Sequence, residues 1–286
     1  MILITDSGST KCDWIAIDNE GKELFKARTK GMNPAILSVE ELQARILESQ
    51  DLVEAKSKVD KVYFYGAGCG TEKPRTALQA LLAAYFNKAN EVIVKEDTAA
   101  AVYAAVGDKP GVVCILGTGS NCCFSDGKNI HQKVVSLGYT IMDEASGNWY
   151  GKELIRDYSF KRMPEILRER FSAAYNLDPD YIKRNLYKEH NPNAFLAKHA
   201  EFIFQNLDER YIKKVLRRGL RKFSRNMILQ FHEELKQYKV HFVGSIAFFA
   251  ESRIKQVADE FDYEVGNIVR RPIEGLVNYH IKKLSA

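Results

Sequence analysis

Two short turns rich in glycine and hydroxyl side chains are the segments of this 286-residue chain best suited to chemistry. The first reads Asp6-Ser7-Gly8-Ser9-Thr10-Lys11 and the second reads Gly117-Thr118-Gly119-Ser120-Asn121. Each turn joins two apolar runs that predict strands, and each second run ends in a further hairpin turn. Turns of this kind present backbone N–H groups to an anion. Two of them facing each other could hold a polyphosphate from both sides, which indicates a nucleotide-dependent phosphotransferase.

The first turn offers several groups to a bound nucleotide. Asp6 could hold a hydrated Mg²⁺ through water, because that ion prefers oxygen ligands. The backbone of Gly8 and the hydroxyl of Ser9 or Thr10 could donate to phosphate oxygens. Lys11 could neutralise charge that develops on the transferred group. Alone, these residues would equally fit a plain β-hairpin with a polar tip, and the matching second turn favours the functional interpretation.

Asp97 is the candidate for a catalytic base. It follows the apolar strand predicted at 92–94 and precedes the alanine-rich helix predicted at 98–106. The carboxyl ends of strands in parallel sheets face the ligand crevice, and a positioned base contributes a factor of about 10² to 10⁴ to a proton transfer. The plainer interpretation is that Asp97 caps the helix. Glu96 is adjacent, but side chains alternate along a strand, so one of the two should point into the crevice.

Two further segments place polar residues where helices are predicted to begin. Asp143-Glu144-Ala145-Ser146-Gly147-Asn148-Trp149 has two acids that could cap a helix or bind the hydroxyl groups of a polyol. Gly244-Ser245 follows the buried strand predicted at 240–243, and a close backbone approach there would suit a flat ring such as adenine. An ordinary strand-to-helix corner has the same pattern. The chain has no Gly-x-x-x-x-Gly-Lys-Ser/Thr motif, so it is not a P-loop enzyme.

These residues are carried by an order of elements that occurs twice. Strand, strand, strand, helix, strand, helix is predicted in both halves, with the third strand of the second half at Ile130–Val135. The repeat predicts an α/β chain with two similar domains, 1–107 and 108–286, and a cleft between them. The second contains a helical insertion at about 147–238, whose helices could form a homodimer contact or pack on the sheet. The terminal helix, 273–286, is open to packing back on the first domain.

Composition bounds the remaining classes of function. The residues are 45% hydrophobic and 28% charged, which supports a packed core. The net charge of +5 is mild and no basic-aromatic module occurs, so we expect no nucleic-acid partner. No apolar run approaches the roughly 18 residues of a membrane span, and no leader precedes the first strand, so we expect no membrane partner. The five cysteines lack a CxxC spacing, which indicates a reducing, cytoplasmic location.

Together these motifs resemble the BadF/BadG/BcrA/BcrD ATPase family of the actin, hexokinase and Hsp70 superfamily, and within it the N-acetylglucosamine kinases. The resemblance spans almost the whole chain. It implies duplicated ribonuclease H-like (actin-like ATPase) domains with a central cleft, ATP and Mg²⁺ as cofactors, and a small-molecule sugar as partner. The segments 6–11 and 117–122 look like the two phosphate motifs, 243–247 looks like the adenosine motif, and Asp97 falls at the position of the catalytic base.

The resemblance also implies which residues touch each substrate. ATP and its phosphates would meet Asp6, Gly8, Ser9, Thr10, Lys11, Gly117, Thr118, Gly119, Ser120, Gly244 and Ser245. The sugar would meet Asn33, Ala67, Gly68, Asp97, Thr118, Asn121, Asp143, Ser146 and Gly147. Met142 and Ala145 replace the two glycines that usually flank the acidic pair of the sugar loop, so the exact sugar stays open.

The implied activity is ATP-dependent phosphorylation of N-acetylglucosamine, or a related amino sugar, at O6. Two alternatives stay open. One is an ATPase that activates a 2-hydroxyacyl-CoA dehydratase, with an iron–sulfur cluster held by cysteines between two subunits. Cys122 and Cys123 would point to opposite faces of a strand, which disfavours a shared cluster. The other is a sugar sensor without catalysis.

Overall fold

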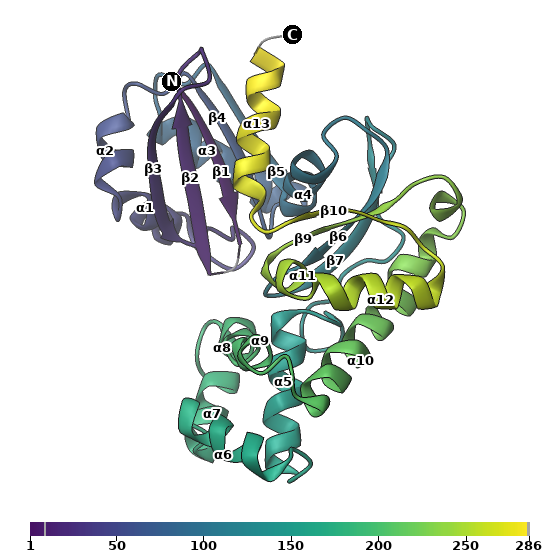
Figure 1. Cartoon of the computed structure of the whole chain (residues 1–286). Coiled ribbons are helices and arrows are strands. Elements are labelled where there is room, and N and C mark those ends of the chain that lie inside the picture. The colour runs from purple at the N-terminus through teal and green to yellow at the C-terminus, as the bar shows by residue number, and fades with distance from the viewer. Residues whose placement is uncertain (9, 285–286) are drawn as a thin grey trace. The chain divides into compact units, whose positions relative to one another are not determined.

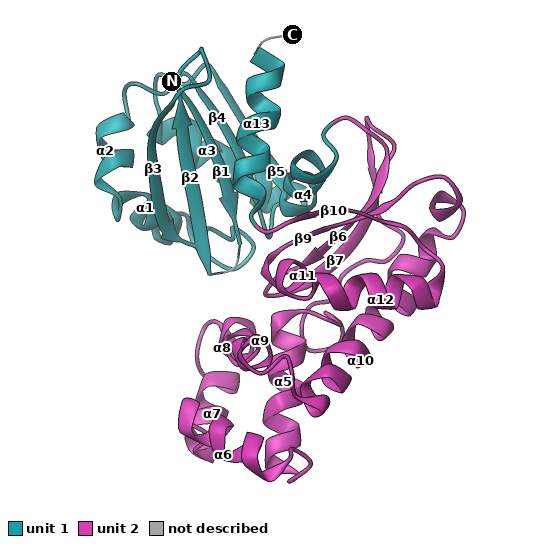
Figure 2. Cartoon of the chain, in the orientation of Figure 1, with its two compact units in different colours: residues 1–107, 271–286 teal, residues 108–270 magenta. Residues whose placement is uncertain are grey.

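The computed structural model describes residues 1–8 and 10–284 (Figure 1). The chain divides into two compact units, Met1–Gly107 with Arg271–Ala286 and Asp108–Arg270 (Figure 2). Each unit is an α/β structure around a mixed five-stranded sheet. In both sheets the strands lie in the order third, second, first, fourth, fifth of that unit. The expected α/β class is confirmed, and the repeat read from the sequence is a repeat of sheet topology.

The first unit carries five strands and five helices in the described residues. The strands are β1 (Ile2–Ser7), β2 (Lys11–Ile17), β3 (Glu23–Lys30), β4 (Lys61–Gly66) and β5 (Glu91–Glu96). The helices are α1 (Val39–Leu47), α2 (Gln50–Ala55), α3 (Glu72–Tyr85), α4 (Asp97–Ala105) and α13 (Pro272–Leu284). β1 pairs antiparallel with β2 and parallel with β4, and β4 pairs parallel with β5. The carboxyl ends of β1, β4 and β5 therefore meet at one edge of the sheet.

Local sequence signals explain several of these elements. Ser38 and Glu41 form a complete capping box at the start of α1, each side chain accepting from the other's backbone N–H. α3 buries Leu78 and Leu82 at a helical spacing against the core of the first unit. β1 is apolar on both faces, as expected of a strand with neighbours on both sides and helices above and below.

The terminal helix α13 packs within the first unit, against α4, β1 and β2. Gly275 permits this contact, because a Cβ there would lie 2.7 Å from the Cα of Ala104. Farther along α13, Ile281 fills the space beside Gly21 of the β2–β3 turn. Residues from 271 onward thus complete the core of the unit with which the chain began.

The second unit repeats the sheet and adds helices. Its strands are β6 (Gly111–Leu116), β7 (Ser120–Ser125), β8 (Ile130–His131), β9 (Val240–Val243) and β10 (Val265–Val269). Its helices are α5 (Gly147–Ser159), α6 (Glu165–Ala174), α7 (Pro179–Tyr187), α8 (Pro192–Lys198), α9 (Glu201–Gln205), α10 (Arg210–Asn226), α11 (Ser245–Phe249) and α12 (Glu251–Phe261), with 3-10 turns η1 (Ile228–Phe231) and η2 (Glu234–Lys236). Within the described range, no helix combines the length and apolar character needed to cross a membrane.

One strand is shorter than expected. β8 ends at His131, so the prediction of a strand over Ile130–Val135 is wrong for its last four residues, 132–135. β8 is an edge strand that pairs with two residues of β7, and Val135 is 72% exposed. Val134 still packs against the core of the second unit, but β8 lies at the edge of its sheet and, among the described residues, has a ladder partner on one side alone, β7.

Candidate active site

The first candidate turn joins β1 to β2 in the first unit. The N–H of Gly8 donates to the carbonyl of Lys11 at 2.9 Å, which closes the turn. Gly8 and Thr10 are exposed, and Ser9 lies outside the described residues. The Nζ of Lys11 lies 3.3 Å from a carboxylate oxygen of Asp13, so this cation already has an ionic partner at the turn.

Asp6 and Asp97 form the acidic centre of this unit. Asp6 is the penultimate residue of β1, and Asp97 is the first residue of α4, just after β5. Burial and the negative charges of Asp97 and Asp13 raise the pKa of Asp6 to about 7, against a smaller lowering by Lys11. The two carboxylates repel each other when both are ionised, and they are partly buried. A cation bound beside them would offset this repulsion.

The neighbouring acid Glu96 has a different role. It is the N-cap residue of α4, although its side chain makes no capping hydrogen bond, and Asp97 is the first helical residue. The alternative that Asp97 caps the helix is therefore wrong. Glu96 accepts a hydrogen bond from Thr98 at 3.2 Å and lies against Gly70, where a Cβ would be 2.8 Å from its Oε1. Glu96 thus lies between Gly70 and Thr98, within the first unit.

Asn33 and Gly68, both predicted to contact sugar, are brought into direct contact. A Cβ on Gly68 would lie 1.9 Å from Oδ1 of Asn33, and Gly68 has a φ of +82°, so glycine is required there on two counts. Oδ1 of Asn33 accepts from the N–H of Ala35 at 2.9 Å, which fixes its side chain. Ala67, the third predicted residue of this group, precedes Gly68.

Ser7 holds the two segments that carry Asn33 and Gly68 to the end of β1. Its Oγ accepts from the N–H of Met32 at 2.9 Å, and its carbonyl accepts from the N–H of Ala67 at 2.9 Å. Next to Gly68, the thiol of Cys69 has its pKa raised to about 12 by burial and then by the charges of Asp97 and Glu96. The charge of Asp97 therefore acts both on Asp6, next to the β1–β2 turn, and on Cys69, next to Gly68.

The second candidate turn joins β6 to β7 in the second unit. The N–H of Gly117 donates to the carbonyl of Gly119 at 3.0 Å, and the carbonyl of Gly117 accepts from the N–H of Gly147 at 2.8 Å. A Cβ on Gly117 would meet nothing within 4 Å, so the backbone there is open to a ligand. Gly147 begins α5, and its own Cβ would lie 3.3 Å from the carbonyl of Gly117. This glycine allows the helix to start against the turn.

Asn148 links the second turn to the acidic loop, a role that the sequence analysis missed. Its backbone N–H and its Nδ2 both donate to the carbonyl of Thr118, at 3.0 and 2.7 Å. Nδ2 also donates to Oδ2 of Asp143 at 2.8 Å. The buried Oδ1 of Asn148 has no hydrogen-bond partner in the described structure, which leaves an acceptor for a ligand or water. The sequence did offer one signal for this role, because Asn148 lies within the polar segment 143–149.

Asp143 is held in place from three sides. Its Oδ1 accepts from the N–H of Ser120 at 3.3 Å, and a Cβ on Gly119 would lie 2.9 Å from its Oδ2. Burial raises the pKa of Asp143, while the bonds from Asn148 and Ser120 oppose that rise. Asp143 has a φ of 69° and Ala145 a φ of 58°, both in the left-handed region. The loop thus carries backbone strain beside the phosphate turn.

The other predicted residues of the second unit have clear surroundings. Ser146 is fully buried and caps α5, with its Oγ accepting from the N–H of Trp149 at 3.2 Å. Oδ1 of Asn121 accepts from the N–H of Cys122 at 2.8 Å, so this amide is turned toward its own backbone.

The predicted adenosine turn packs on the second phosphate turn. Gly244 has a φ of +120°, and a Cβ there would lie 2.3 Å from the carbonyl oxygen of Leu116 and 3.1 Å from the nitrogen of Gly117. Ser245 is exposed and begins α11. The close approach that the sequence suggested at Gly244 is therefore present, and it brings the end of β9 against the end of β6.

Two mixed sheets of one strand order, each with a glycine turn between its first two strands, define the duplicated fold of the actin-like ATPases. The chain belongs to the BadF/BadG/BcrA/BcrD ATPase family, whose model matches residues 5–159. A provisionally assigned N-acetylglucosamine kinase from Porphyromonas gingivalis is similar over 99% of both chains, with 35% sequence identity and a TM-score of 0.91. No curated protein sequence matches this chain.

More distant structures share the fold. A second provisionally assigned N-acetylglucosamine kinase, from Chromobacterium violaceum, has 14% identity and a TM-score of 0.70, covering 97% of this chain and 98% of that one. A ROK family glucokinase from Streptomyces griseus, solved in complex with glucose and AMPPNP, has 15% identity and a TM-score of 0.57 over 97% of each chain.

Proposed function

We propose that this protein transfers the γ-phosphoryl group of ATP to a hydroxyl group of a sugar. Family membership supports ATP as the donor. The 35% identity with the provisionally assigned kinase of Porphyromonas gingivalis supports a sugar as the acceptor. The observation that carries the proposal is the position of Asp97, whose charge acts on Asp6 at the phosphate turn and on Cys69 at the sugar loop. A base for the acceptor hydroxyl must serve both substrates in this way.

In this proposal Asp97 accepts the proton of the attacking hydroxyl as its oxygen bonds to the γ-phosphorus, while the bond from that phosphorus to the β–γ bridging oxygen breaks and ADP leaves. The phosphate oxygens would accept hydrogen bonds from backbone N–H and hydroxyl groups of two turns, Gly8–Thr10 and Gly117–Ser120. Ser9 of the first turn lies outside the described residues. Lys11 would shift from Asp13 or share its charge with the transferred group. Gly244 and Ser245 would border the adenine, where the backbone is already closely packed.

Asp6 fits the role of a magnesium ligand through water. Burial raises the pKa of Asp6, and the negative charges of Asp97 and Asp13 raise it further, so a divalent cation would offset part of this unfavourable charge. No group of three His, Cys, Asp or Glu side chains among the described residues could enclose a metal by itself. That fits Mg²⁺, which commonly keeps several waters and binds one or two carboxylates together with substrate phosphates. When bound, the ion would neutralise charge on the phosphates.

The proposed sugar is N-acetylglucosamine, phosphorylated at O6. Asp143 would accept from sugar hydroxyls, since each of its oxygens uses one protein donor and keeps further acceptor capacity. Asn33, Ala67 and Gly68 would contact the sugar from the first unit, with Thr118, Asn121, Ser146 and Gly147 from the second. Ala145 is fully buried, so its methyl group adds bulk to the loop where the family usually has glycine.

The test is an ADP-release assay with a panel of hexoses, amino sugars and N-acetylated sugars. We expect N-acetylglucosamine to give the highest kcat/KM and 6-deoxy-N-acetylglucosamine to give no sugar-dependent ADP. Asp97→Asn should lower turnover at least about a hundredfold with nearly unchanged ATP affinity. Asp51→Asn, at an exposed residue of α2, is the matched control. Near-normal turnover of Asp97→Asn would overturn the base, and sugar binding without any ADP release would overturn the kinase.

The alternative of a dehydratase activator is not favoured by the cysteines. Cys122 and Cys123 are each 1% exposed, and the Sγ of Cys122 lies 3.4 Å from the Sγ of Cys114 inside the core. A cluster shared between two subunits needs thiolates at a surface. These buried thiols would have to leave the core to reach one.

A further inference from the structure

A groove of about 520 Å³ on the second unit is lined by arginine and lysine alone. Eight of its nine lining residues lie on α10 between Arg210 and Arg225, and the ninth is Arg253 of α12. α10 and α12 pack side by side in the same unit, so two helices form the groove. The mild net charge of the chain gave no sign of this concentration.

The eight cations of α10 form one stripe along one face. They recur at spacings of three and four residues from 210 to 225, which corresponds to about 22 Å of helix. Like charges at this spacing destabilise a helix. The opposite face buries Ile212, Leu216 and Phe223 in the core, and this burial offsets the repulsion. The fold therefore tolerates the stripe but does not require it.

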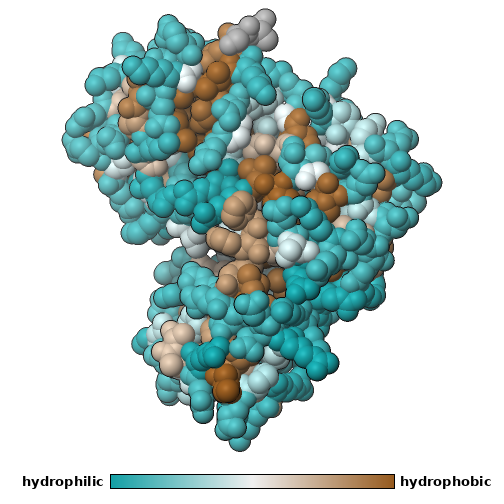
Figure 3. All heavy atoms as spheres, viewed as in Figure 1, coloured by the Kyte–Doolittle hydropathy of each residue, from teal (hydrophilic) through white to brown (hydrophobic). Residues whose placement is uncertain are grey.

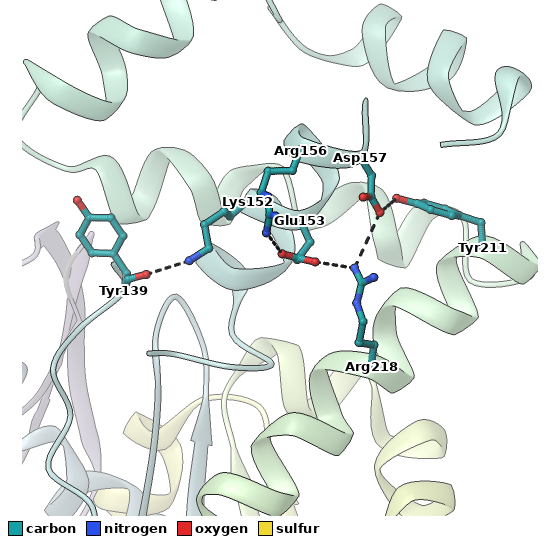
Figure 4. A network of polar contacts seen from close by, with 7 residues as sticks. All are labelled: Tyr139, Lys152, Glu153, Arg156, Asp157, Tyr211 and Arg218. Atoms are coloured by element: carbon teal, nitrogen blue, oxygen red, sulfur yellow. Dashed lines mark hydrogen bonds and ion pairs between the residues drawn. The ribbon is translucent and has the colours of Figure 1, made fainter. Parts of the chain in front are cut away.

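Few carboxylates neutralise the groove. Glu260 of α12 pairs with Arg217 at 2.7 Å and also with Arg221. Arg218 reaches Glu153 at 2.6 Å and Asp157 at 3.9 Å, both on α5 (Figure 4). Five cations of α10 make no ion pair with a carboxylate anywhere in the described chain: Arg210, Lys213, Lys214, Lys222 and Arg225. Nine positive charges thus face three acids, and a large excess is left for an anionic ligand.

We propose that this groove binds an inorganic polyphosphate chain. Six of the lining residues are arginines, whose planar forks match phosphate oxygens in pairs. The stripe is long and straight, which suits a linear anion with closely spaced charges better than a single phosphate group. Recognition would combine charge with the paired hydrogen bonds of the arginine forks, which favours a ligand whose phosphate groups follow one another directly along the chain.

The absence of aromatic and apolar residues from the lining argues against other polyanionic partners. Single-stranded nucleic acids stack their bases on aromatic side chains, and Trp149, which lies under Arg218 and Lys222, is only 5% exposed. Protein interfaces rely on buried aromatic or apolar anchors, and a helix that lies in a membrane surface inserts an apolar face. The apolar face of α10 is instead buried in the core of its own unit. The surface of the helical part of this unit is mainly hydrophilic on the face shown in Figure 3.

The experiment compares binding of long-chain polyphosphate to three forms of the full chain. The groove variant carries Arg210→Gln, Lys214→Gln, Lys222→Gln and Arg225→Gln, all at exposed residues without a carboxylate partner. The control variant carries Lys22→Gln, Lys58→Gln, Lys88→Gln and Lys128→Gln, which are also exposed and change the net charge equally. Circular dichroism and thermal melting show whether each variant is folded.

We expect the groove variant to bind polyphosphate at least about tenfold more weakly than wild type. A plot of the logarithm of the binding constant against the logarithm of the salt concentration should have a slope that is smaller in magnitude by about 3. The control variant should change affinity less than about twofold, and an oligonucleotide of equal charge should bind wild type at least about tenfold more weakly than polyphosphate. Any of three outcomes would overturn the proposal. The two variants could lose affinity for polyphosphate equally, wild type could bind the oligonucleotide as tightly as polyphosphate or more tightly, or wild type could bind no polyphosphate. It is independent of the proposed kinase activity, because no substituted residue belongs to the phosphate turns or the sugar loops.

Discussion

The hydroxyl of Tyr65 and the Nε2 of His280 lie 2.9 Å apart, although the two residues are separated by 215 positions in the sequence. Tyr65 is on β4 and His280 is on α13, so this bond ties the last helix to the sheet of the first unit. The ring of His280 also stacks on Tyr63, with centroids 4.1 Å apart. A terminal segment is thus held by a buried polar contact, and that contact responds to pH.

We expect the contribution of His280 to the stability of the first unit to fall in mild acid. Burial, followed by the positive charge of Lys95, lowers the pKa of His280 to about 4, while Glu91 opposes the shift. The unfolded chain, with a histidine pKa near 6.5, binds the proton more readily below that value. The stabilisation is therefore complete above about pH 6.5 and is lost as pH falls toward 4, by up to about 3 kcal/mol.

Urea unfolding between pH 4 and 7 measures this effect. His280→Gln removes the titrating ring and keeps a polar group near Tyr65. The variant should be less stable at pH 7 and should depend less on pH in this window. If its stability falls with pH as steeply as that of wild type, His280 is not the group responsible.

Asn148 is expected to be a positioning residue of the second phosphate turn. Asn148→Ala removes the bonds from Nδ2 to Thr118 and Asp143. A loosened turn should lower kcat/KM for the phosphoryl transfer by about tenfold to a hundredfold, because small displacements of reacting groups are costly. Asn185→Ala, which removes one side-chain bond to Tyr181 within α7, is the control and should leave kinetics unchanged. Loss of stability without loss of kcat/KM in Asn148→Ala would assign it a structural role alone.

Gly68→Ala should disrupt the contact between residues 68 and 33 more than a left-handed alanine without a collision would. The new Cβ would collide with Asn33, in addition to about 1–2 kcal/mol for a left-handed alanine. Gly107→Ala is a close control, because Gly107 has a φ of +64° but its Cβ would meet nothing closer than 3.9 Å. We expect Gly68→Ala to raise KM for the sugar several-fold with little change for ATP. A KM unchanged in both variants would remove Asn33 and Gly68 from the sugar site.

Ala145→Gly should be nearly neutral for stability, although it deletes a buried methyl group. Relief of the left-handed strain, about 1–2 kcal/mol, offsets the lost burial and the greater freedom of the unfolded chain. Ala258→Gly is the matched change, at a buried alanine inside α12. The free energy of unfolding should fall by about 1–2 kcal/mol more in Ala258→Gly than in Ala145→Gly. Equal losses would show that the conformation of Ala145 is not strained.

Local patterns in the sequence were sufficient for much of the fold. Glycine and hydroxyl residues between two apolar runs indicated the β1–β2 and β6–β7 turns, because short-range sterics decide where a strand reverses. The repeated order of elements indicated two similar α/β units, and the motifs taken together indicated the family. The strand over Ile130–Val135 was overestimated, since the pairing available to an edge strand depends on its neighbours and not on its own residues.

The sequence by itself determined the turns, the element order, the family and the candidate base, because these depend on residues close together in the chain. Only the tertiary structure decided that α13 joins the first unit, that Asn148 bonds to Thr118 and Asp143, and that Arg253 of α12 joins the cations of α10 in one groove. Those outcomes depend on which side chains meet after the helices and sheets have packed, and a contact between distant residues has no local signal.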